Sequence, residues 1–574
     1  MSNQPVHNLY KKFLDNPKEY EVANNLWGLI PVNIIEAVKQ LSKIKKEYGN
    51  FKVNDELKGA LKNKMRKLGV LTSNVASNID SIDEGIVESG QQPNCLGGPS
   101  FIFNKITCTW EISRNCSEKC IPVYFIGDYD SIQPELVNIR IPSLGFRGLL
   151  ISYPIPSGYE GSPIRLLPNP TEEWLEKTFD KIESNYRGLL KGTDPQVQEK
   201  ILLKFDHIET IVKNAYFSTN NVSDFSSKII GTIVNFEGNL GIPMIFPSDS
   251  ELKPFFQKGF EFLLAEPNRS NFIRESNKSV DLIEGLGYNP QIGRRKWDYI
   301  PFFFECPTPN CHDSRIELLL SIEGTKSVLS GTCPKCKEKY SFSYDSLKPD
   351  LSDIIDRITP RVDSRQIIVN TAIPVLSHVG GPGETSYYAE VVPAFKVLKI
   401  PTPIFIRYTR VFYNTPWNEV SGKVLKGKGF PSILEESLFK SLANWVEANK
   451  QNNESQIFES HKLINKNIDE TYERLLSHET ELRLEVESIK KQLSNTKNRD
   501  VLIKTMKEKE TLLQYVENYL SLAYGRYSTE KYGQEVSWSW IDFALSSGIR
   551  EIVNVYKRLY GPFTPNSSTY FVNL

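Results

Sequence analysis

Long hydrophobic runs are absent from this chain of 574 residues. No apolar segment approaches the roughly 18 residues that a membrane-spanning helix needs, and the first residues, MSNQPVHNLYKKF, contain no apolar signal core. A surplus of charge is absent too, because Lys+Arg and Asp+Glu both number 69. Broad nucleic-acid binding needs a cationic surface, so it is disfavoured, although a local basic patch stays open. We therefore expect a cytoplasmic protein without a membrane segment.

Cysteine is scarce, with 8 in the whole chain. This density is too low for a disulfide scaffold and fits a reducing compartment. The sequence also lacks a P-loop and the His-containing and Lys-rich signatures of tRNA synthetases, so no motif indicates the use of ATP. A hydrophobic content of 40% indicates a globular protein, and the length predicts about two to four domains.

The segment HVGGPGET, residues 378–385, is the most informative part of the chain. An apolar, β-branched strand is expected before it at 367–376, a helix after it at 387–398, and another strand at 402–407. This order makes a βαβ unit and therefore a parallel sheet. The glycines would let an anion approach the helix N-terminus, and Glu384 could hold an amine. A plain connection with glycines for tight packing explains the same residues equally well.

A second Gly-rich segment, SGQQPNCLGGPSFIFNKI at 89–106, follows a short strand expected at 85–87 and leads into a helix. A further strand at 121–126 ends in Gly-Asp-Tyr-Asp at 127–130. In open parallel sheets, ligands bind beyond the carboxyl ends of the strands. Three such ends are polar or Gly-rich here, and their convergence predicts a ligand site.

Two pairs of cysteines have the spacing of metal ligands. Cys306 and Cys311 form the first pair, and Cys333 and Cys336, in the segment CPKC, form the second. Strand-like sequence lies between the pairs, as in a zinc ribbon, and four sulfurs complete a tetrahedral site with no open position. We therefore predict structural zinc. His312 is the only substitute ligand nearby, and free thiols are the alternative.

Beyond about residue 455 the apolar residues follow a 4-3 spacing, interrupted by a polar turn at 494–500. The pattern predicts two antiparallel helices that form a coiled-coil hairpin, with separate amphipathic helices as the alternative. A last helix at 538–560 is expected to pack back on the body. The seam consists of Ile468, Tyr472, Leu475, Leu482, Val486, Ile489, Leu493, Leu502, Met506, Leu513, Val516 and Leu520.

These patterns divide the chain into two parts. Residues 1–413 are predicted to form the α/β core with its insertions, which are a connecting region at 150–300 and the zinc ribbon at 301–345. Residues 414–574 are predicted to form a helical coiled-coil domain.

The two Gly-rich segments resemble the signatures of a known family. GQQPNCLGGPSFIFNKI and HVGGPGETSYYAEVVPAFKVLKIPTPIF are similar to motifs of the cysteine ligase of bacillithiol biosynthesis, the cysteine-adding enzyme. GYNPQI at 287–292, RVDSR at 361–365 and the helix that runs to LYGP match more loosely. The resemblance covers nearly the whole chain in order.

The resemblance implies a Rossmann-like core with inserted segments, similar to class I aminoacyl-tRNA synthetases, and a coiled coil that forms a homodimer. The family reaction joins cysteine to the amine of glucosaminyl-malate. The residues that would line the substrate pocket are Gly90, Gln91, Gln92, Gly98, Pro99, Lys105, Arg365, Gly380, Gly381, Pro382, Gly383 and Glu384.

This chain departs from the family pattern at two places. The family strand that ends in Glu-Asp-His-Asp ends here in Gly-Asp-Tyr-Asp, so Tyr129 replaces the histidine. A phenol titrates near pH 10 and imidazole near pH 6.5, so acid–base catalysis would pass to Asp128 or Asp130. The zinc ribbon, which stands where the family has a shorter segment, is the second departure. Both suggest a diverged branch with a changed amine acceptor or without activity on bacillithiol precursors.

The leading hypothesis is therefore a ligase that joins an amino acid, with cysteine as the first candidate, to an amine. ATP and Mg²⁺ would activate the carboxyl group of the amino acid, and Lys105 and Arg365 would neutralise phosphate charge. Asp128, Asp130 or Glu384 would hold or deprotonate the amine.

Two other classes compete with this hypothesis. One is a non-catalytic interaction protein that docks through its zinc ribbon and coiled coil. The other is an RNA-linked, synthetase-like enzyme with a basic face on the ribbon, for which a solvated surface of mixed charge is the simpler interpretation. The cations of that face are Arg315, Lys326, Lys335, Lys337 and Lys339.

Overall fold

The computed structural model of the chain describes residues 4–145, 148–495, 499–525 and 533–574. Its centre is a five-stranded sheet in which every pair of neighbouring strands is parallel. The predicted parallel-sheet core is thus confirmed. The strands are, in spatial order, β14 (Ile404–Arg407), β13 (Val375–Gly380), β2 (Ile86–Gln91), β3 (Ile121–Ile126) and β6 (Met244–Ile245).

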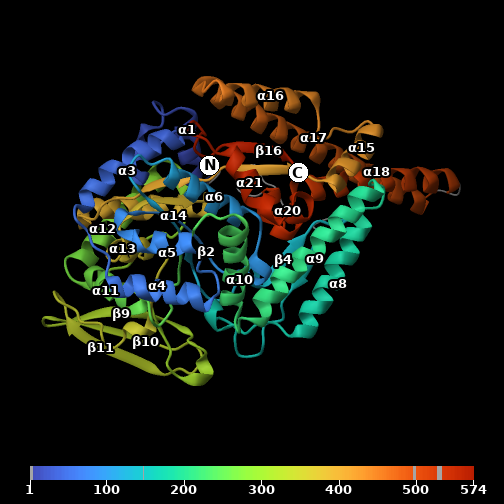
Figure 1. Cartoon of the computed structure of the whole chain (residues 1–574). Coiled ribbons are helices and arrows are strands. Elements are labelled where there is room, and N and C mark those ends of the chain that lie inside the picture. The colour runs from blue at the N-terminus through green and yellow to red at the C-terminus, as the bar shows by residue number, and fades with distance from the viewer. Residues whose placement is uncertain (1–3, 146–147, 496–498, 526–532) are drawn as a thin grey trace.

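Helices cover both faces of this sheet (Figure 1). Side chains alternate between the faces along a strand, and β14 shows the result. Its Ile404 and Ile406 pack in one cluster with α3 (Ile34–Tyr48) and α6 (Phe101–Arg114). Its Phe405 packs in another with α1 (His7–Asp15), α2 (Asn24–Trp27) and α14 (Pro382–Leu398). Burial on both faces explains why these strands read as nearly continuous apolar runs.

The expected strand at 367–376 is wrong in its first half. Residues Arg365–Asn370 form the helix α13, and β13 begins only at Val375, after Pro374. β-branched residues disfavour a helix only weakly, and every residue of α13 is buried, so packing outweighs propensity. In contrast, β2 runs past the expected strand at 85–87 into the polar residues 88–91.

The connecting region is mainly helical and packs in the same hydrophobic cluster as the central sheet. The helices α8 (Glu172–Leu189) and α9 (Pro195–Phe217) lie side by side along one edge of the molecule (Figure 1). Two short ladders join β4 (Asn138–Ile141) to β5 (Leu149–Ser152) and β1 (Gln4–Pro5) to β7 (Tyr288–Asn289). The other helices of this part and of the N-terminal region are α4 (Asp55–Lys67), α5 (Ser73–Asp80), α7 (Pro134–Val137), α10 (Val222–Gly231), α11 (Gln257–Leu264) and α12 (Asn268–Gly285).

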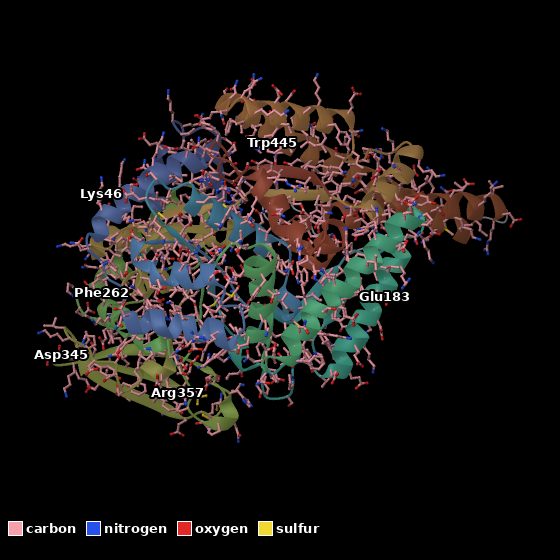
Figure 2. The ribbon with its side chains drawn as sticks, viewed as in Figure 1. Lys46, Glu183, Phe262, Asp345, Arg357 and Trp445 are labelled. Carbon is pink, nitrogen blue, oxygen red and sulfur yellow. The ribbon has the colours of Figure 1, made fainter. Side chains whose placement is uncertain are left out.

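The cysteine-bearing insertion is a separate antiparallel sheet, as the zinc-ribbon prediction requires. Its strand order is β11-β10-β9-β8-β12. The ribbon lies at the lower left and α16 (Glu436–Lys450) at the top of the view, as Asp345 and Trp445 show (Figure 2). The strands are β8 (Tyr299–Glu305), β9 (Arg315–Glu323), β10 (Lys326–Thr332), β11 (Lys339–Asp345) and β12 (Ile358–Pro360).

The predicted helical hairpin consists of α17 (Glu454–Asn495) and α18 (Asp500–Tyr524), which pack against each other. The ion pairs Arg483–Glu517 and Lys490–Glu510 cross between them, and this order of partners requires an antiparallel arrangement. The expected turn includes 496–498, which lie outside the described residues. Among the helices that the structure describes, none is both long and apolar enough to cross a membrane.

The end of the chain returns to the central body. The strand β16 (Thr569–Asn573) pairs in parallel with β15 (Arg410–Asn414), and α15 (Pro416–Gly427) follows β15. The single helix expected at 538–560 is wrong, because the chain forms α20 (Trp540–Ser547) and α21 (Ile549–Leu559) after the short α19 (Gln534–Ser537). Gly548, with φ 96°, ends α20, since few other residues adopt that conformation.

A buried carboxyl group joins three of these segments. Asp542 of α20 accepts hydrogen bonds from Tyr186 of α8 and Tyr413 of β15, each at 2.9 Å. Burial raises the pKa of Asp542 to about 7, although these hydrogen bonds partly counteract it. The folded chain thus binds this proton more tightly than the unfolded chain does.

The fold should therefore lose stability as pH rises. The contribution of Asp542 is complete below its unfolded pKa of about 3.9 and is lost as pH rises through about 7. Urea unfolding between pH 5 and 8 should show this fall, and Asp542→Asn should reduce it by roughly 1 kcal/mol or more. If the free energy of unfolding falls by the same amount in both proteins, Asp542 is not the cause of the fall.

Candidate functional site

A cavity of about 870 Å³ lies at the carboxyl ends of β2, β3 and β13. Parallel sheets place ligands at this edge. Both Gly-rich segments contribute to its wall, as the sequence predicts. The predicted site residues that line it are Gly90, Gln91, Gln92, Gly98, Pro99, Lys105, Asp130, Arg365, Gly381, Pro382, Gly383 and Glu384.

Two predicted site residues do not line the cavity. Asp128 is 4% exposed and accepts a 2.6 Å hydrogen bond from Ser248, behind the wall. Gly380 ends β13, where a Cβ atom would lie 2.7 Å from the ring of Phe405 and 2.9 Å from Glu384. Its glycine therefore serves close packing, which is the plain alternative that the sequence leaves open.

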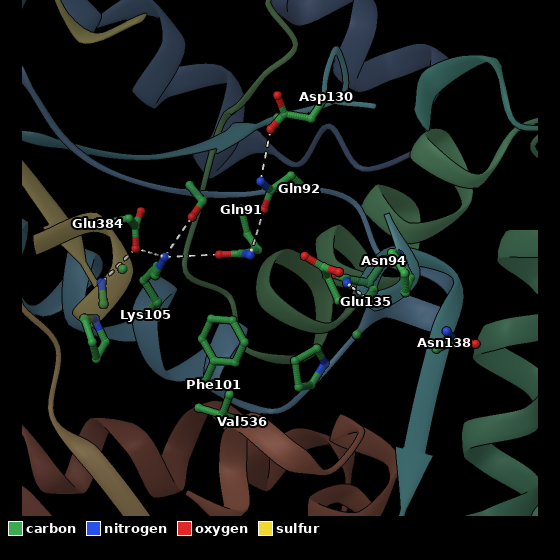
Figure 3. A pocket seen from close by; sticks show the side chains of 18 of the residues that line it. Gln91, Gln92, Asn94, Phe101, Lys105, Asp130, Glu135, Asn138, Glu384 and Val536 are labelled. Atoms are coloured by element: carbon green, nitrogen blue, oxygen red, sulfur yellow. Dashed lines mark hydrogen bonds and ion pairs between the residues drawn. The ribbon is translucent and has the colours of Figure 1, made fainter. Parts of the chain in front are cut away.

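A buried ion pair between Lys105 and Glu384 forms the centre of the wall (Figure 3). Lys105 Nζ lies 2.6 Å from Glu384 Oε2, 2.9 Å from Gly90 O and 3.3 Å from Gln91 Oε1. Glu384 Oε2 also accepts from the backbone N–H of Gly381 at 2.7 Å, so it caps the N-terminus of its own helix. The pair thus joins α6, β2 and α14.

The electrostatic environment keeps Glu384 ionised. Burial opposes its ionisation, but Lys105 and His378 outweigh this effect and lower its pKa to about 2. The Glu384 side chain is still 18% exposed, whereas Lys105 is 1% exposed. The ionised carboxylate of Glu384, rather than the ammonium group of Lys105, is therefore the partner of this ion pair that faces the cavity, which suits an ammonium group better than an anion.

His378 and Glu88 complete a network that the sequence analysis did not identify. His378 lies between two carboxylates, with Nδ1 2.7 Å from Glu88 Oε1 and Nε2 3.3 Å from Glu384 Oε1. Arg365 donates to the same Glu88 oxygen at 3.0 Å. Both missed residues interrupt apolar strands and are partners in the register of β2 and β13. That interruption is the sequence signal that could have revealed them.

A chain of amide hydrogen bonds links the ion pair to Asp130 (Figure 3). Gln91 donates to Gln92 at 2.9 Å, and Gln92 donates to Asp130 at 3.0 Å. Burial raises the pKa of Asp130, although Arg315, Gln92 and Arg365 partly counteract it. Asp130 is thus the carboxylate of the cavity wall whose proton affinity is increased.

Tyr129 lines the cavity as well, at the position where the family pattern has histidine. It is 5% exposed, and burial raises the pKa of its hydroxyl further above its ordinary value. Tyr129 therefore does not exchange protons near neutral pH. Residues of the C-terminal segment, Val536, Ser537 and Ser539, form another part of the wall that no motif predicted.

The four predicted metal ligands come together in the ribbon. One ligand atom from each of Cys306, Cys311, Cys333 and Cys336 lies within 4.8 Å of the others. Two of the sulfur–sulfur distances are 3.7 and 3.8 Å. A tetrahedral zinc ion with bonds of about 2.3 Å to sulfur requires about 3.8 Å between sulfurs, so the geometry fits zinc. His312 stacks on Tyr159 and is not part of this group.

Comparisons with known proteins agree with the geometry. The family model for the N-terminal Rossmann-like domain of the bacillithiol biosynthesis protein BshC matches residues 176–408. A Bacillus cereus (strain Q1) protein named "Putative cysteine ligase BshC" is 22% identical over 342 residues, which are 58% of this chain and 56% of that protein. A protein of the same name from Christiangramia forsetii is 21% identical over 401 residues, or 68% and 66% of the two chains. The first match thus spans only about half of the relative's length.

The metal site makes a prediction that needs no substrate. The purified chain should contain about one zinc ion, because four thiolates close one tetrahedral site. Elemental analysis should show that Cys333→Ser loses most of this zinc, whereas Cys116→Ser, outside the cluster, retains it. Equal zinc content in the two variants would contradict the assignment.

Neutralising Glu384 should destabilise the fold. Glu384→Gln keeps an oxygen for the N–H of Gly381 but leaves the buried Lys105 without an opposite charge, which costs about 2–4 kcal/mol. Urea unfolding measures this loss. The control is Glu419→Gln, since the pair Glu419–Lys423 is 42% and 73% exposed and should contribute less than about 1 kcal/mol. Similar losses in both variants would disprove the importance of the buried pair.

Proposed function

We propose that this chain, whose residues 176–408 match the BshC family model, is a ligase that forms an amide bond between an amino acid and an amine. Cysteine is the first candidate for the amino acid, and an amino sugar such as glucosaminyl-malate is the first candidate for the amine. The observation that carries the proposal is the convergence of both Gly-rich segments on one cavity around the Lys105–Glu384 pair. A plain structural connection would not need a cavity of about 870 Å³ lined by these residues.

The pKa values and positions of Glu384, Asp130 and Asp128 assign these carboxyl groups different roles in the proposed reaction. A general base is most effective when its pKa lies near the working pH. Glu384, with a pKa of about 2, is too weak a base but can hold the amine as an ammonium ion. Asp130 lies in the wall and has a raised pKa, so it would accept the proton that the attacking amine loses. Asp128 has a pKa of about 6 but lies behind the wall.

The carboxyl group of the amino acid must be activated before an amine can displace its oxygen. In the proposed reaction ATP supplies this activation with Mg²⁺, and the leaving group carries the phosphate. Lys105 and Arg365 are each paired with a glutamate, at 2.6 and 3.0 Å. They therefore contribute less free positive charge toward a phosphate than their sequence positions imply.

The proposal also includes a homodimer formed through the helical hairpin. Leu484 on α17 is 61% exposed and Val501 on α18 is 69% exposed. Single exposed apolar side chains are common on protein surfaces, so the homodimer in this proposal rests on the resemblance to the family.

The RNA-linked alternative receives less support from the ribbon. Three of the five cations of the expected basic face form contacts within the protein: Arg315 pairs with Asp130 at 3.5 Å, Lys335 donates to Gly158 O at 2.8 Å and Lys337 donates to Pro334 O at 2.7 Å. Lys326, Lys337 and Lys339 are exposed. Two exposed lysines on the strands of the ribbon and one in its loop are typical of a solvated surface.

Mass spectrometry of products tests the ligase directly. The zinc-loaded protein is incubated with cysteine, ATP and Mg²⁺ against glucosaminyl-malate and other amino-sugar acceptors. We expect a product with the mass of acceptor plus cysteine minus water. Glu384→Ala should reduce its formation by about 100-fold or more, because the amine loses its fixed counter-charge.

The surface variant Glu419→Ala is the matched control and should turn over normally. Normal turnover by Glu384→Ala would show that Glu384 does not belong to the active site. The absence of product with every acceptor, from folded protein, would favour the interaction-protein alternative.

A further inference from the structure

Both cysteine pairs of the ribbon lie against one segment of the connecting region, residues 158–165. Glu305, next to Cys306, is fully buried and receives two hydrogen bonds from Arg165, at 2.8 and 2.9 Å. Asp313, two residues after Cys311, accepts a third hydrogen bond from Arg165 at 2.7 Å. Arg165 thus binds one residue before and one residue after the first cysteine pair.

The second cysteine pair contacts the other end of the same segment. Lys335 lies between Cys333 and Cys336, and its Nζ donates to Gly158 O at 2.8 Å and to Ser162 Oγ at 3.3 Å. A metal ion that holds the four sulfurs would therefore fix the positions of Glu305, Asp313 and Lys335 relative to one another.

Residues 162–165 in turn pair with the strand end that forms the cavity wall. Ile132 N donates to Ser162 O at 2.9 Å, Ile164 N to Asp130 O at 2.8 Å and Arg165 N to Asp128 O at 3.1 Å. These bonds surround Tyr129 and Asp130, which both line the cavity. The ribbon also reaches the wall directly, because Arg315 of β9 lies 3.5 Å from Asp130 Oδ1.

The cysteine loops contain backbone that needs an external constraint. His312, Asp313 and Lys337 have φ values of 47°, 52° and 65°. Residues other than glycine rarely adopt such values unless the surrounding structure holds them. A metal ion bound by the four sulfurs would supply this constraint and would thereby fix the contact of Asp313 with Arg165.

We propose that the four-cysteine metal site positions Asp130 in the cavity wall, acting through Arg165, Lys335 and Arg315. The ribbon then serves the cavity as well as its own stability. The inference concerns the geometry of the wall, so it does not depend on the reaction proposed above.

Hydrogen–deuterium exchange with and without metal tests the proposal in the full chain. Removal of zinc with a chelator should speed exchange in peptides that contain the amides of Ile132, Ile164 and Arg165 by about tenfold, equivalent to about 1.4 kcal/mol of opening free energy. The amides of Ile86 and Ile121, which bond to Pro374 O and Gly85 O in the central sheet, are the internal reference. Unchanged exchange at the wall, or an equal rise at the reference amides, overturns the proposal.

Variants that keep their zinc separate the attachment from metal binding itself. Zinc-loaded Lys335→Ala and Arg315→Met should each speed exchange around Asp130 several-fold. The control is Lys337→Ala, since Lys337 lies on the same loop and, among the residues that the structure describes, donates to Pro334 O of that loop alone. If Lys335→Ala and Arg315→Met both behave like Lys337→Ala, the proposed route from the metal site to the wall is wrong.

Discussion

The buried contact between Lys105 and Glu384 is the interaction on which the site depends. Burying two charges is unfavourable unless hydrogen bonds satisfy the groups that leave water. Here two of the acceptors around Lys105 Nζ, Gly90 O and Gln91 Oε1, come from the end of β2, and the third, Glu384 Oε2, comes from α14. Because Lys105 lies on α6 and its acceptors lie on β2 and α14, these contacts hold the three elements in one arrangement, and the cavity forms between them.

Carboxylates that alternate with basic side chains extend this arrangement into the sheet. The contacts run in the order Arg365, Glu88, His378, Glu384 and Lys105, so each glutamate lies between two basic side chains. Burial raises the pKa of Glu88, but Arg365 and His378 outweigh it and lower the value overall. The network keeps two carboxylates ionised inside a protein and leaves only part of one, Glu384, in contact with the cavity.

Segments that are far apart in sequence close the remaining sides of the cavity. The C-terminal residues Val536, Ser537 and Ser539 lie in its wall, and Trp540 donates a hydrogen bond to Leu96 O in the first Gly-rich segment. On the opposite side the ribbon contacts Asp130 through Arg315. The division of the chain at residue 413 stays a prediction, and the part beyond it contributes directly to the site.

The sequence by itself determined the parallel sheet, the two Gly-rich segments, the grouping of the four cysteines and the helical hairpin. Each of these follows from local spacing or periodicity, which the chain carries whatever its tertiary contacts. Only the tertiary structure decided that 365–370 is a helix, that Gly380 and Asp128 lie outside the cavity, and that His378 and Glu88 connect its charges. Those outcomes depend on contacts between residues up to 290 positions apart, and no local pattern encodes which distant partner will neutralise a buried charge.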